Sequence, residues 1–274
     1  MILWLFEIRT RTSRAVCVSA PTKESLLPMI EPDILAAADA LRTRGVVIVP
    51  CYNAGARVRP TLELLLAVAD RVVVVDDGST DGCTTGLESL PLSIITLPVN
   101  RGKGHALIAG IRHALTQTDV DVVALLDADG QHDPSELPAL YAAFRENEAD
   151  LLVGARRLDR SKTPWRSRFG NQVTAWVSRH LFKCPLTDTQ CGYRLLSPRF
   201  AAKFITSVPG GRYETEMLML LFAIRGGYRL ASAPVTTLYE PGNRSSHFRK
   251  VRDSLRIYAA LFRTLTGRGL TREP

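Results

Sequence analysis

The sequence predicts an α/β protein with a mostly parallel sheet flanked by helices, because apolar β-branched runs alternate along it with segments of helical periodicity. The runs at 46–50 and 72–75 are continuously apolar, as is typical of strands that are covered on both faces. Between them and later runs, Leu107, Ile108 and Ile111 recur at the spacing of one helix face. We expect one such domain in this chain.

The first half of the chain supplies most of the expected elements. Strands are recognised as short runs rich in valine, isoleucine and leucine, at 46–50, 71–76, 92–97, 122–127 and 150–153. Helices are expected where apolar residues return at helical spacing, around 32–42, 62–69, 103–115 and from Pro134 onward. This alternation predicts strands that lie parallel, with the helices as crossovers.

The second half of the chain is less regular. The elements expected there are a helix near 171–182, a loop at 187–193, a buried helix near 214–224 and a basic C-terminal segment. The apolar run that ends at Ile224 is far shorter than the roughly 20 residues that span a bilayer. We expect an extension at 1–44, a domain at 45–240 and a basic helical tail at 241–274.

Composition and charge narrow the class of protein. Of the 274 residues, 46% are hydrophobic and 23% are charged, which is typical of a globular chain and not of a disordered one. The formal net charge of +8 favours an anionic partner such as nucleic acid, a phosphorylated substrate or a membrane surface. The five cysteines form no CxxC pair, so reduced thiols in a cytoplasmic protein are expected. Peripheral attachment at the inner face of the membrane stays open.

Polar residues stand where the expected strands end. The first strand leads into Pro50, Tyr52 and Asn53, and the second into Asp76 and Asp77. In open parallel sheets, ligands bind beyond the carboxyl ends of the strands. A carboxylate after the second strand can accept hydrogen bonds from a nucleobase or ribose. A polar turn, with Asp81 as the cap of the next helix, also explains this segment, and for Asp81 it is the preferred interpretation.

The end of the fourth expected strand carries the sharpest signal. Asp127 and Asp129 stand one residue apart there, so both carboxylates can reach a common ion, and Gln131 adds a neutral oxygen. Oxygen ligands suit Mg²⁺ or Mn²⁺, which commonly bridge substrate phosphates. The segment alone is equally compatible with an ordinary polar turn. Lys103 stands between Gly102 and Gly104 at the start of an expected helix, whose N-terminus favours anions, so it is placed to touch a diphosphate.

Taken together and in this order, the motifs resemble those of the inverting family-two glycosyltransferases with the GT-A fold. The matching segments are 47–53, 75–81, 100–104 and 127–134, within a similarity that spans about 45–193. Inside that family the chain is most similar to the dolichol- and polyprenyl-phosphate sugar synthases. The resemblance implies a GT-A sheet with a nucleotide-sugar half at 45–155 and an acceptor half at 156–240.

The resemblance also implies roles for individual residues. The metal site it implies consists of Asp127, Asp129 and Gln131, with Asp129 as the catalytic carboxylate. The nucleotide-binding positions are Pro50, Tyr52, Asn53, Asp76, Asp77, Lys103 and Asp127. The acceptor-binding positions are Arg156, Arg168 and Arg244, and residues 188–194 match the later acceptor-side loop. Asn53 stands where the phosphate-lipid synthases usually have glutamate, which leaves the acceptor less certain than the donor.

The acceptor decides whether the reaction needs a base. A lipid phosphate is largely ionised near neutral pH, because its second pKa is about 6. A hydroxyl acceptor needs a carboxylate, and the candidates are Glu214, Glu216 and Asp188. Glu214 and Glu216 are two residues apart on an expected helix, so at most one of them faces the site. We expect a polyprenyl or dolichyl phosphate acceptor, with a hydroxyl of a glycan or lipid as the alternative.

The expected donor is a UDP-, GDP- or dTDP-linked sugar, used with Mg²⁺ or Mn²⁺. A nucleotidyltransferase is a rival, but it normally has a glycine-rich basic loop after the first strand, where residues 51–55 read CYNAG. A basic nucleic-acid-binding protein is a second rival. The sequence shows no helix-turn-helix, zinc-finger or aromatic RNA-binding motif, so no nucleic acid is expected. The sequence predicts no oligomeric state.

Overall fold

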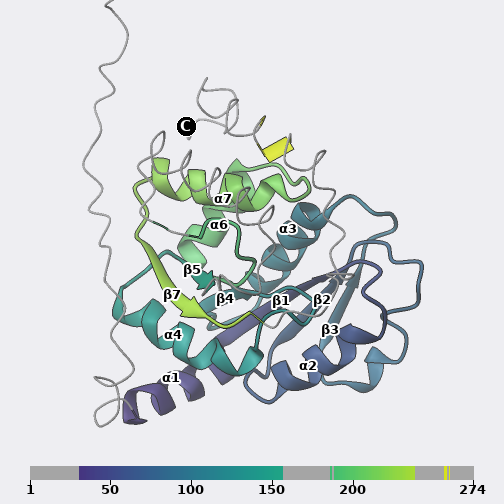
Figure 1. Ribbon diagram of the computed structural model, residues 1–274, viewed down its shortest axis with the longest axis horizontal. Helices are drawn as coiled ribbons and strands as arrows, with labels where there is room; N and C mark the ends of the chain where they lie inside the picture. The colour runs from purple at the N-terminus through teal and green to yellow at the C-terminus, as the bar shows by residue number, and fades with distance from the viewer. Residues whose placement is uncertain (1–30, 157–185, 187, 238–255, 258, 260–274) are drawn as a thin grey trace, which may run out of the picture.

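The computed structural model describes residues 31–156, 186, 188–237, 256–257 and 259. These residues form a seven-stranded sheet in the order β3-β2-β1-β4-β6-β5-β7 (Figure 1). The strands are β1 (Gly45–Cys51), β2 (Val72–Asp76), β3 (Ser93–Thr96), β4 (Val122–Leu125), β5 (Leu151–Arg156), β6 (Arg194–Leu196) and β7 (Leu230–Val235). All neighbouring pairs are parallel except those of β6, which runs antiparallel to both β4 and β5.

Helices cover both faces of this sheet. On one face lie α1 (Glu31–Arg44), α2 (Val58–Leu66) and α4 (Leu137–Glu146). On the other lie α3 (Lys103–Ala114), α6 (Pro198–Ser207) and α7 (Glu214–Arg225). Within each set the helices touch one another, α1 with α4 and α3 with both α6 and α7. Among the described residues, no helix combines the length and apolar character that crossing a membrane requires.

The central strands are buried because both of their faces are covered. Val46, Val47, Ile48 and Val49 of β1 have no exposed surface, and the valines of β2 are nearly as buried. Helix α3 crosses β1 and β2 closely at Gly110, where an added Cβ would lie only 2.4 Å from the side chain of Ile48. The continuous apolar runs in the sequence are therefore the buried centre of the sheet.

The five strands expected from the sequence are confirmed, with small shifts at their ends. The helix expected from residue 62 begins earlier, at Val58, and the helix expected from Pro134 begins with a 3₁₀ turn, Pro134–Glu136. The helix expected near 171–182 lies outside the described residues. Strands β6 and β7 and helix α6 were not expected. Strand β7 reads LASAPV and lies at the sheet edge, where its proline is tolerated and no apolar run announces it.

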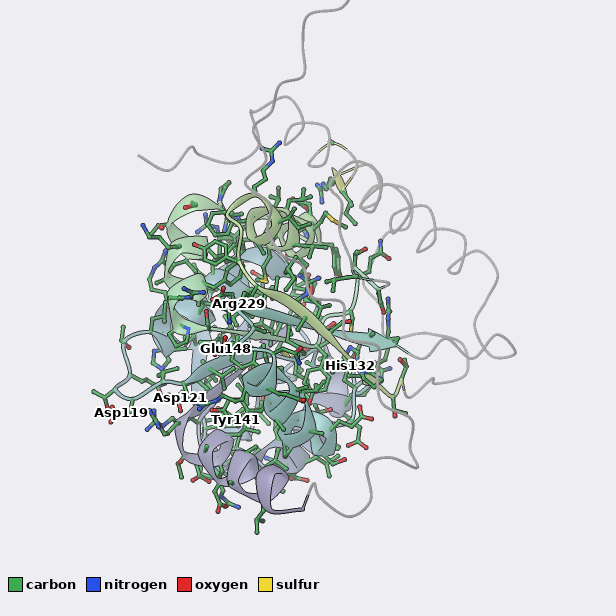
Figure 2. All side chains as sticks on the ribbon, turned by 90° about the vertical axis from the view of Figure 1, so that its left-hand side faces the viewer. Asp119, Asp121, His132, Tyr141, Glu148 and Arg229 are labelled. Atoms are coloured by element: carbon green, nitrogen blue, oxygen red, sulfur yellow. The ribbon has the colours of Figure 1, made fainter. Side chains whose placement is uncertain are left out.

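The expected extension at 1–44 includes helix α1, whose Leu41 is fully buried in the common core. Helix α1 also closes the amino end of the sheet, because Arg44 at its last position pairs with Asp121 just before β4 at 2.8 Å. Figure 2 shows His132, which follows the carboxyl end of β4, on the side of the molecule away from Asp121. The domain boundaries stay predictions.

Candidate functional site

The site expected from the sequence lies at one edge of the sheet. Strands β1, β2, β4 and β5 run in the same direction, so their carboxyl ends share that edge. Because β6 is antiparallel to β4 and β5, the segment 188–193 that precedes it reaches the same edge. Among the described residues, those expected on the donor side therefore meet Arg156 and Asp188 from the expected acceptor side here, although they are far apart in the sequence.

Lys103 connects the end of β4 with helix α7. Its Nζ lies 2.6 Å from Oδ1 of Asp127 and 3.1 Å from Oε2 of Glu216, and all three side chains are largely buried. Burial opposes the charge of Lys103, but the two carboxylates outweigh it and hold the pKa of the ammonium well above its ordinary value. Burial also disfavours the Asp127 anion, and Lys103 outweighs that effect and lowers the pKa of Asp127.

Asp129 is a carboxylate in an unfavourable place for an anion. Its Oδ1 accepts a hydrogen bond from the backbone N–H of Gln131 at 3.0 Å. Burial, together with the negative charge of Asp127, nevertheless raises the pKa of Asp129 to about 6. A cation bound between Asp127 and Asp129 would compensate this charge, so the two carboxylates fit a divalent ion.

No group of three or more His, Cys, Asp or Glu side chains in the described part of the chain is arranged to hold a metal ion. Magnesium sites in nucleotide enzymes commonly use only one or two carboxylates and complete their coordination with water and substrate phosphates. The donor set at the end of β4 is of this kind.

The loops after β1 and β2 are tied to each other. Asn53 has a left-handed backbone with φ of 47°, and its Oδ1 accepts the N–H of Thr80 at 2.8 Å. The backbone N–H of Asn53 donates to Oγ of Ser79 at 3.0 Å, and Asp76 accepts the N–H of Ser79 at 2.8 Å. Asparagine tolerates the left-handed region because its short side chain can bond locally. The two strand ends therefore form one hydrogen-bonded surface, made of residues 50–53 and 76–80 and called the donor shelf below. Tyr52 lies half-buried in it.

Asp77 orders the start of helix α3. It is buried, and its two oxygens accept the backbone N–H groups of Arg101 at 2.8 Å and Gly102 at 2.7 Å. The expected contact of Asp77 with a nucleotide stays a prediction. Asp81 was expected to cap a following helix, and this is wrong. Its carboxylate accepts the N–H groups of Gly55 and Cys83, so it holds a turn against the loop after β1.

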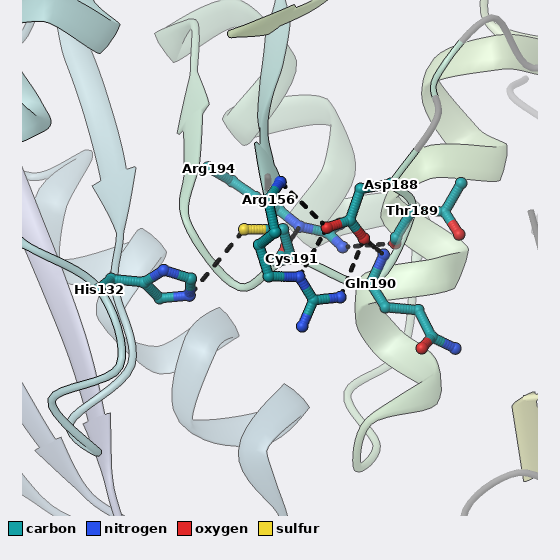
Figure 3. A network of polar contacts seen from close by, with 7 residues as sticks. All are labelled: His132, Arg156, Asp188, Thr189, Gln190, Cys191 and Arg194. Carbon is teal, nitrogen blue, oxygen red and sulfur yellow. Dashed lines mark hydrogen bonds and ion pairs between the residues drawn. The ribbon is translucent and has the colours of Figure 1, made fainter. Parts of the chain in front are cut away.

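Arg156 and Asp188 face each other on the acceptor side (Figure 3). Nε of Arg156 lies 2.6 Å from Oδ2 of Asp188, and Nη2 lies 3.0 Å from Oδ1. The backbone N–H of Gln190 also donates to Asp188, at 3.1 Å. Burial would raise the pKa of Asp188, but the pairing with Arg156 outweighs burial and lowers it. A carboxylate stabilised as an anion is a poor base, so this contact disfavours Asp188 as the base and gives it the task of orienting Arg156.

The two glutamates at the start of α7 point in different directions, as expected. Glu216 pairs with Lys103 beside Asp127, whereas Glu214 turns towards Gly211, where an added Cβ would lie 2.6 Å from its Oε1. Glu216 is therefore the base candidate that reaches the site. Arg168 and Arg244 lie outside the described residues.

The resemblance places Arg194 at the end of the segment 188–194 that matches the acceptor-side loop, but the sequence gives it no role of its own. The residue has no exposed surface, and its guanidinium donates to the carbonyls of Cys191 at 2.9 Å, Glu216 at 2.6 Å and Thr189 at 3.2 Å. In the sequence, Arg194 stands out because it lies within the otherwise apolar run YRLL, and a charged residue in such a run indicates a buried arginine with specific partners.

Comparison with known proteins identifies the family of this domain. The sequence profile described as glycosyl transferase family 2 matches residues 46–201, which is more than half of the chain. The chain belongs to glycosyl transferase family 2. The matched region of this family 2 glycosyltransferase runs from β1 into α6 and carries Asp127, Asp129, Arg156 and Asp188. The expected family and the expected enzyme class are thereby confirmed.

Named relatives of this family 2 glycosyltransferase cover most of its length. An undecaprenyl-phosphate mannosyltransferase of Micrococcus luteus is 32% identical over 206 residues, which are 70% of this chain and 83% of that protein. A polyprenol monophosphomannose synthase of Mycolicibacterium smegmatis is 28% identical over 209 residues, which are 70% of this chain and 77% of that protein.

Solved structures confirm the fold class. Glucosyl-3-phosphoglycerate synthase from Mycobacterium tuberculosis, in complex with Mn²⁺, UDP-glucose and phosphoglyceric acid, superposes with a TM-score of 0.66 at 18% identity. The superposition covers 85% of this chain and 84% of that chain. At this level of identity the likeness shows the fold, and it confirms the expected GT-A type of mostly parallel sheet.

Proposed function

We propose that this glycosyltransferase transfers a sugar, with inversion, from a nucleotide-sugar donor to a polyprenyl or dolichyl phosphate in a metal-dependent reaction. The observation that carries the proposal is the pair Asp127 and Asp129 at the end of β4, with the Arg156–Asp188 pair at the same sheet edge. Two relatives are named for undecaprenyl phosphate and for a polyprenol, and a structural neighbour was solved with Mn²⁺ and UDP-glucose.

The metal would be Mg²⁺ or Mn²⁺, held by Asp129 with Asp127 and Gln131 beside it. The unfavourable burial of the Asp129 charge next to Asp127 supports this assignment. Such an ion, when bound, supplies a Lewis acid that stabilises negative charge on a departing diphosphate. The remaining tasks fall to the side chains of the protein.

Lys103 keeps Asp127 oriented and ionised at the end of β4. A lysine ammonium has three N–H donors, and Asp127 and Glu216 take two of them here. The third N–H is the one that would donate to a phosphate oxygen, in line with the expectation that Lys103 touches the diphosphate. Because Lys103 is largely buried, its charge acts in a weakly screened environment.

The donor shelf holds the nucleotide in this proposal. Pro50, Tyr52, Asn53, Asp76 and Asp77 line it, and the hydrogen bonds of Asn53 and Asp76 fix its shape before a ligand arrives. Preorganisation of this kind reduces the cost of ordering loops on binding. The donor is a UDP-, GDP- or dTDP-linked sugar.

Arg156 binds the acceptor phosphate, together with Arg168 and Arg244 from the rest of the chain. Asp188 accepts from Nε and Nη2 of Arg156, and these two contacts fix the plane in which the guanidinium would meet a phosphate. A lipid phosphate needs no proton acceptor, because its second pKa is about 6. This acceptor also accounts for the chain's +8 charge and implies work at the inner face of the membrane, in the cytoplasm.

A hydroxyl acceptor is the alternative, and Glu216 is the observation that favours it. Its carboxylate contacts Lys103 beside Asp127, so it lies near the expected metal site, and it would have to give up that contact to act as a general base. The two acceptors demand different chemistry and can be separated directly.

The experiment uses the purified chain with Mn²⁺ or Mg²⁺ and a series of UDP-, GDP- and dTDP-sugars. Undecaprenyl phosphate and undecaprenol, both in detergent, serve as matched acceptors that differ only in the phosphate. We expect mass spectrometry to detect a lipid phosphate sugar and no glycosylated alcohol. Transfer to the alcohol alone would establish the hydroxyl alternative, and transfer from no donor to either lipid would refute the proposed function.

A further inference from the structure

Arg194 lies between the strands that carry the two sides of the site. It is the first residue of β6, and its backbone pairs with Leu125 of β4 on one side and Val153 of β5 on the other. Two residues beyond Leu125 the chain reaches Asp127, and three residues beyond Val153 it reaches Arg156. A single position in the sheet is therefore adjacent to both the expected metal site and the expected acceptor site.

The side chain of Arg194 holds two further segments. Its Nε and Nη2 donate to the carbonyls of Cys191 and Thr189 in the loop at 188–193, as Figure 3 shows, and its Nη1 donates to the carbonyl of Glu216 in α7. A guanidinium presents five donors in a fixed plane, so it can reach three carbonyls in different directions. The loop and the helix are joined only through tertiary contacts such as these, since 22 residues separate Arg194 from Glu216.

Each segment that Arg194 holds contacts Asp127 or a partner of Asp127. In the loop, Gly192 lies against that carboxylate, where an added Cβ would be 2.4 Å from Oδ2 of Asp127. In α7, Glu216 contacts Lys103, which contacts Asp127 in turn. The same loop carries Asp188, the partner of Arg156. Displacement of the loop or of α7 would therefore move both sides of the site relative to each other.

The burial of Arg194 is costly without such a role. The residue has no exposed surface, and none of the ion pairs found among the described residues includes it. A buried charge is expensive to desolvate even when it is hydrogen-bonded, and an apolar side chain of similar volume often replaces one without loss of stability. A methionine or leucine here would avoid the desolvation cost but would leave the carbonyls of Thr189, Cys191 and Glu216 without this donor.

We propose that Arg194 is a positioning residue, which fixes the loop at 188–193 and the start of α7 relative to Asp127. It thereby sets the separation between the departing diphosphate and the acceptor held by Arg156. The second statement rests on the proposed function, whereas the first concerns the fold of the loop and of α7 alone.

The test compares Arg194→Met and Arg194→Lys with Leu195→Ala as a matched control. Methionine keeps much of the volume but has no donors, and lysine keeps the charge but lacks the planar fork. Leu195 is the next residue of β6, is equally buried and points to the opposite face of the sheet. Its truncation destabilises the same strand but keeps the three hydrogen bonds that Arg194 makes with Thr189, Cys191 and Glu216.

Two readouts are taken on all four proteins. The first is hydrogen exchange by mass spectrometry. We expect Arg194→Met to accelerate exchange in peptides covering 188–193 and 213–218 by about tenfold more than in β1, because these amides lose their local anchor. Leu195→Ala should raise exchange without singling out these two segments. Where Arg194→Met does not fold, Arg194→Lys gives the same comparison.

The second readout is sugar transfer per folded protein. We expect kcat of Arg194→Met to fall by about 10²-fold, as a small misplacement of reacting groups produces, while KM for the donor stays within about twofold. Arg194→Lys should recover part of kcat, and Leu195→Ala should leave it unchanged.

Exchange and kinetics of Arg194→Met that match those of Leu195→Ala would overturn the proposal. If the wild-type chain transfers no sugar, the proposed function fails, and the exchange comparison still decides whether Arg194 fixes the loop and α7.

Discussion

The ammonium of Lys103 lies 2.6 Å from Asp127 and links it to Glu216, which is 113 residues further along the chain. Helix α3, the end of β4 and the start of α7 are thus joined through one buried cation. Asp127, expected on the donor side, and Glu216, the candidate base, share this contact, so a change at either carboxylate is expected to affect the other.

This linkage predicts strong coupling between Lys103 and Glu216. Lys103→Met leaves two buried carboxylates without their counter-charge, whereas the double variant with Glu216→Gln removes one of them. We expect the double variant to be more stable than the sum of the single effects implies, by about 0.5–3 kcal/mol. Urea unfolding of the four proteins of this cycle measures the coupling. Strictly additive changes in the free energy of unfolding would show that the two side chains do not interact.

The fork of Arg156 predicts an effect confined to the acceptor. Arg156→Lys keeps the charge but loses the two-pronged contact with Asp188, so KM for the lipid phosphate should rise by about tenfold, equivalent to about 1.4 kcal/mol. The donor KM should stay within about twofold, because the donor shelf lies after β1 and β2. Initial rates with each substrate varied in turn test this. Unchanged acceptor kinetics in Arg156→Lys and in Arg156→Ala would remove the role assigned to Arg156.

Asp150 predicts a pH-dependent stability away from the site. Burial opposes its charge, but Arg199, the backbone N–H of Arg229 and Ser197 outweigh burial and lower its pKa. A lowered folded-state pKa contributes stability above the unfolded value of about 3.9, and this stability is lost as the pH falls through the folded-state pKa.

The matched variant for this prediction is Asp150→Asn. At pH 7 it should be less stable than wild type by about 1–3 kcal/mol, because three donors lose a charged acceptor. The difference should shrink as the pH is lowered below the unfolded value of about 3.9, because the unfolded carboxylate takes up its proton before the folded one does. Urea unfolding at several pH values measures it, and a difference that does not change between pH 7 and pH 3 would contradict the assignment.

The central strands and their site-bearing ends could be predicted because each signal is local. Val72–Asp76 is an apolar run followed by acids, and the rule that ligands bind at the carboxyl ends of parallel strands then brings Asp77 and Asp129 to one edge. No contact between distant residues was needed for that inference.

The contacts between side chains inside the site could not be predicted, because they depend on residues that are far apart in the sequence. That Lys103 contacts Glu216, or that Arg194 holds the carbonyl of Glu216, depends on how α7 packs beside α3. Strand β6 has only three residues and includes a buried arginine, so neither its length nor its pattern announces a strand. The resemblance implied an acceptor-side loop at 188–194, but the sequence pattern did not show the antiparallel strand that brings 188–193 to the carboxyl ends of β4 and β5.

The most direct test of the account measures Mn²⁺ binding in the presence of the nucleoside diphosphate of the preferred donor. Electron paramagnetic resonance monitors this binding, because the signal of free Mn²⁺ is lost when the ion binds. Wild type and Asp129→Asn are compared at equal folded concentration. Because burial disfavours the Asp129 charge, the asparagine variant should unfold at or above the wild-type temperature. We expect wild type to bind Mn²⁺ with the nucleotide and Asp129→Asn to lose both this binding and turnover. Equal Mn²⁺ binding by the two proteins, with sugar transfer that persists in EDTA, would contradict a divalent ion held at the end of β4.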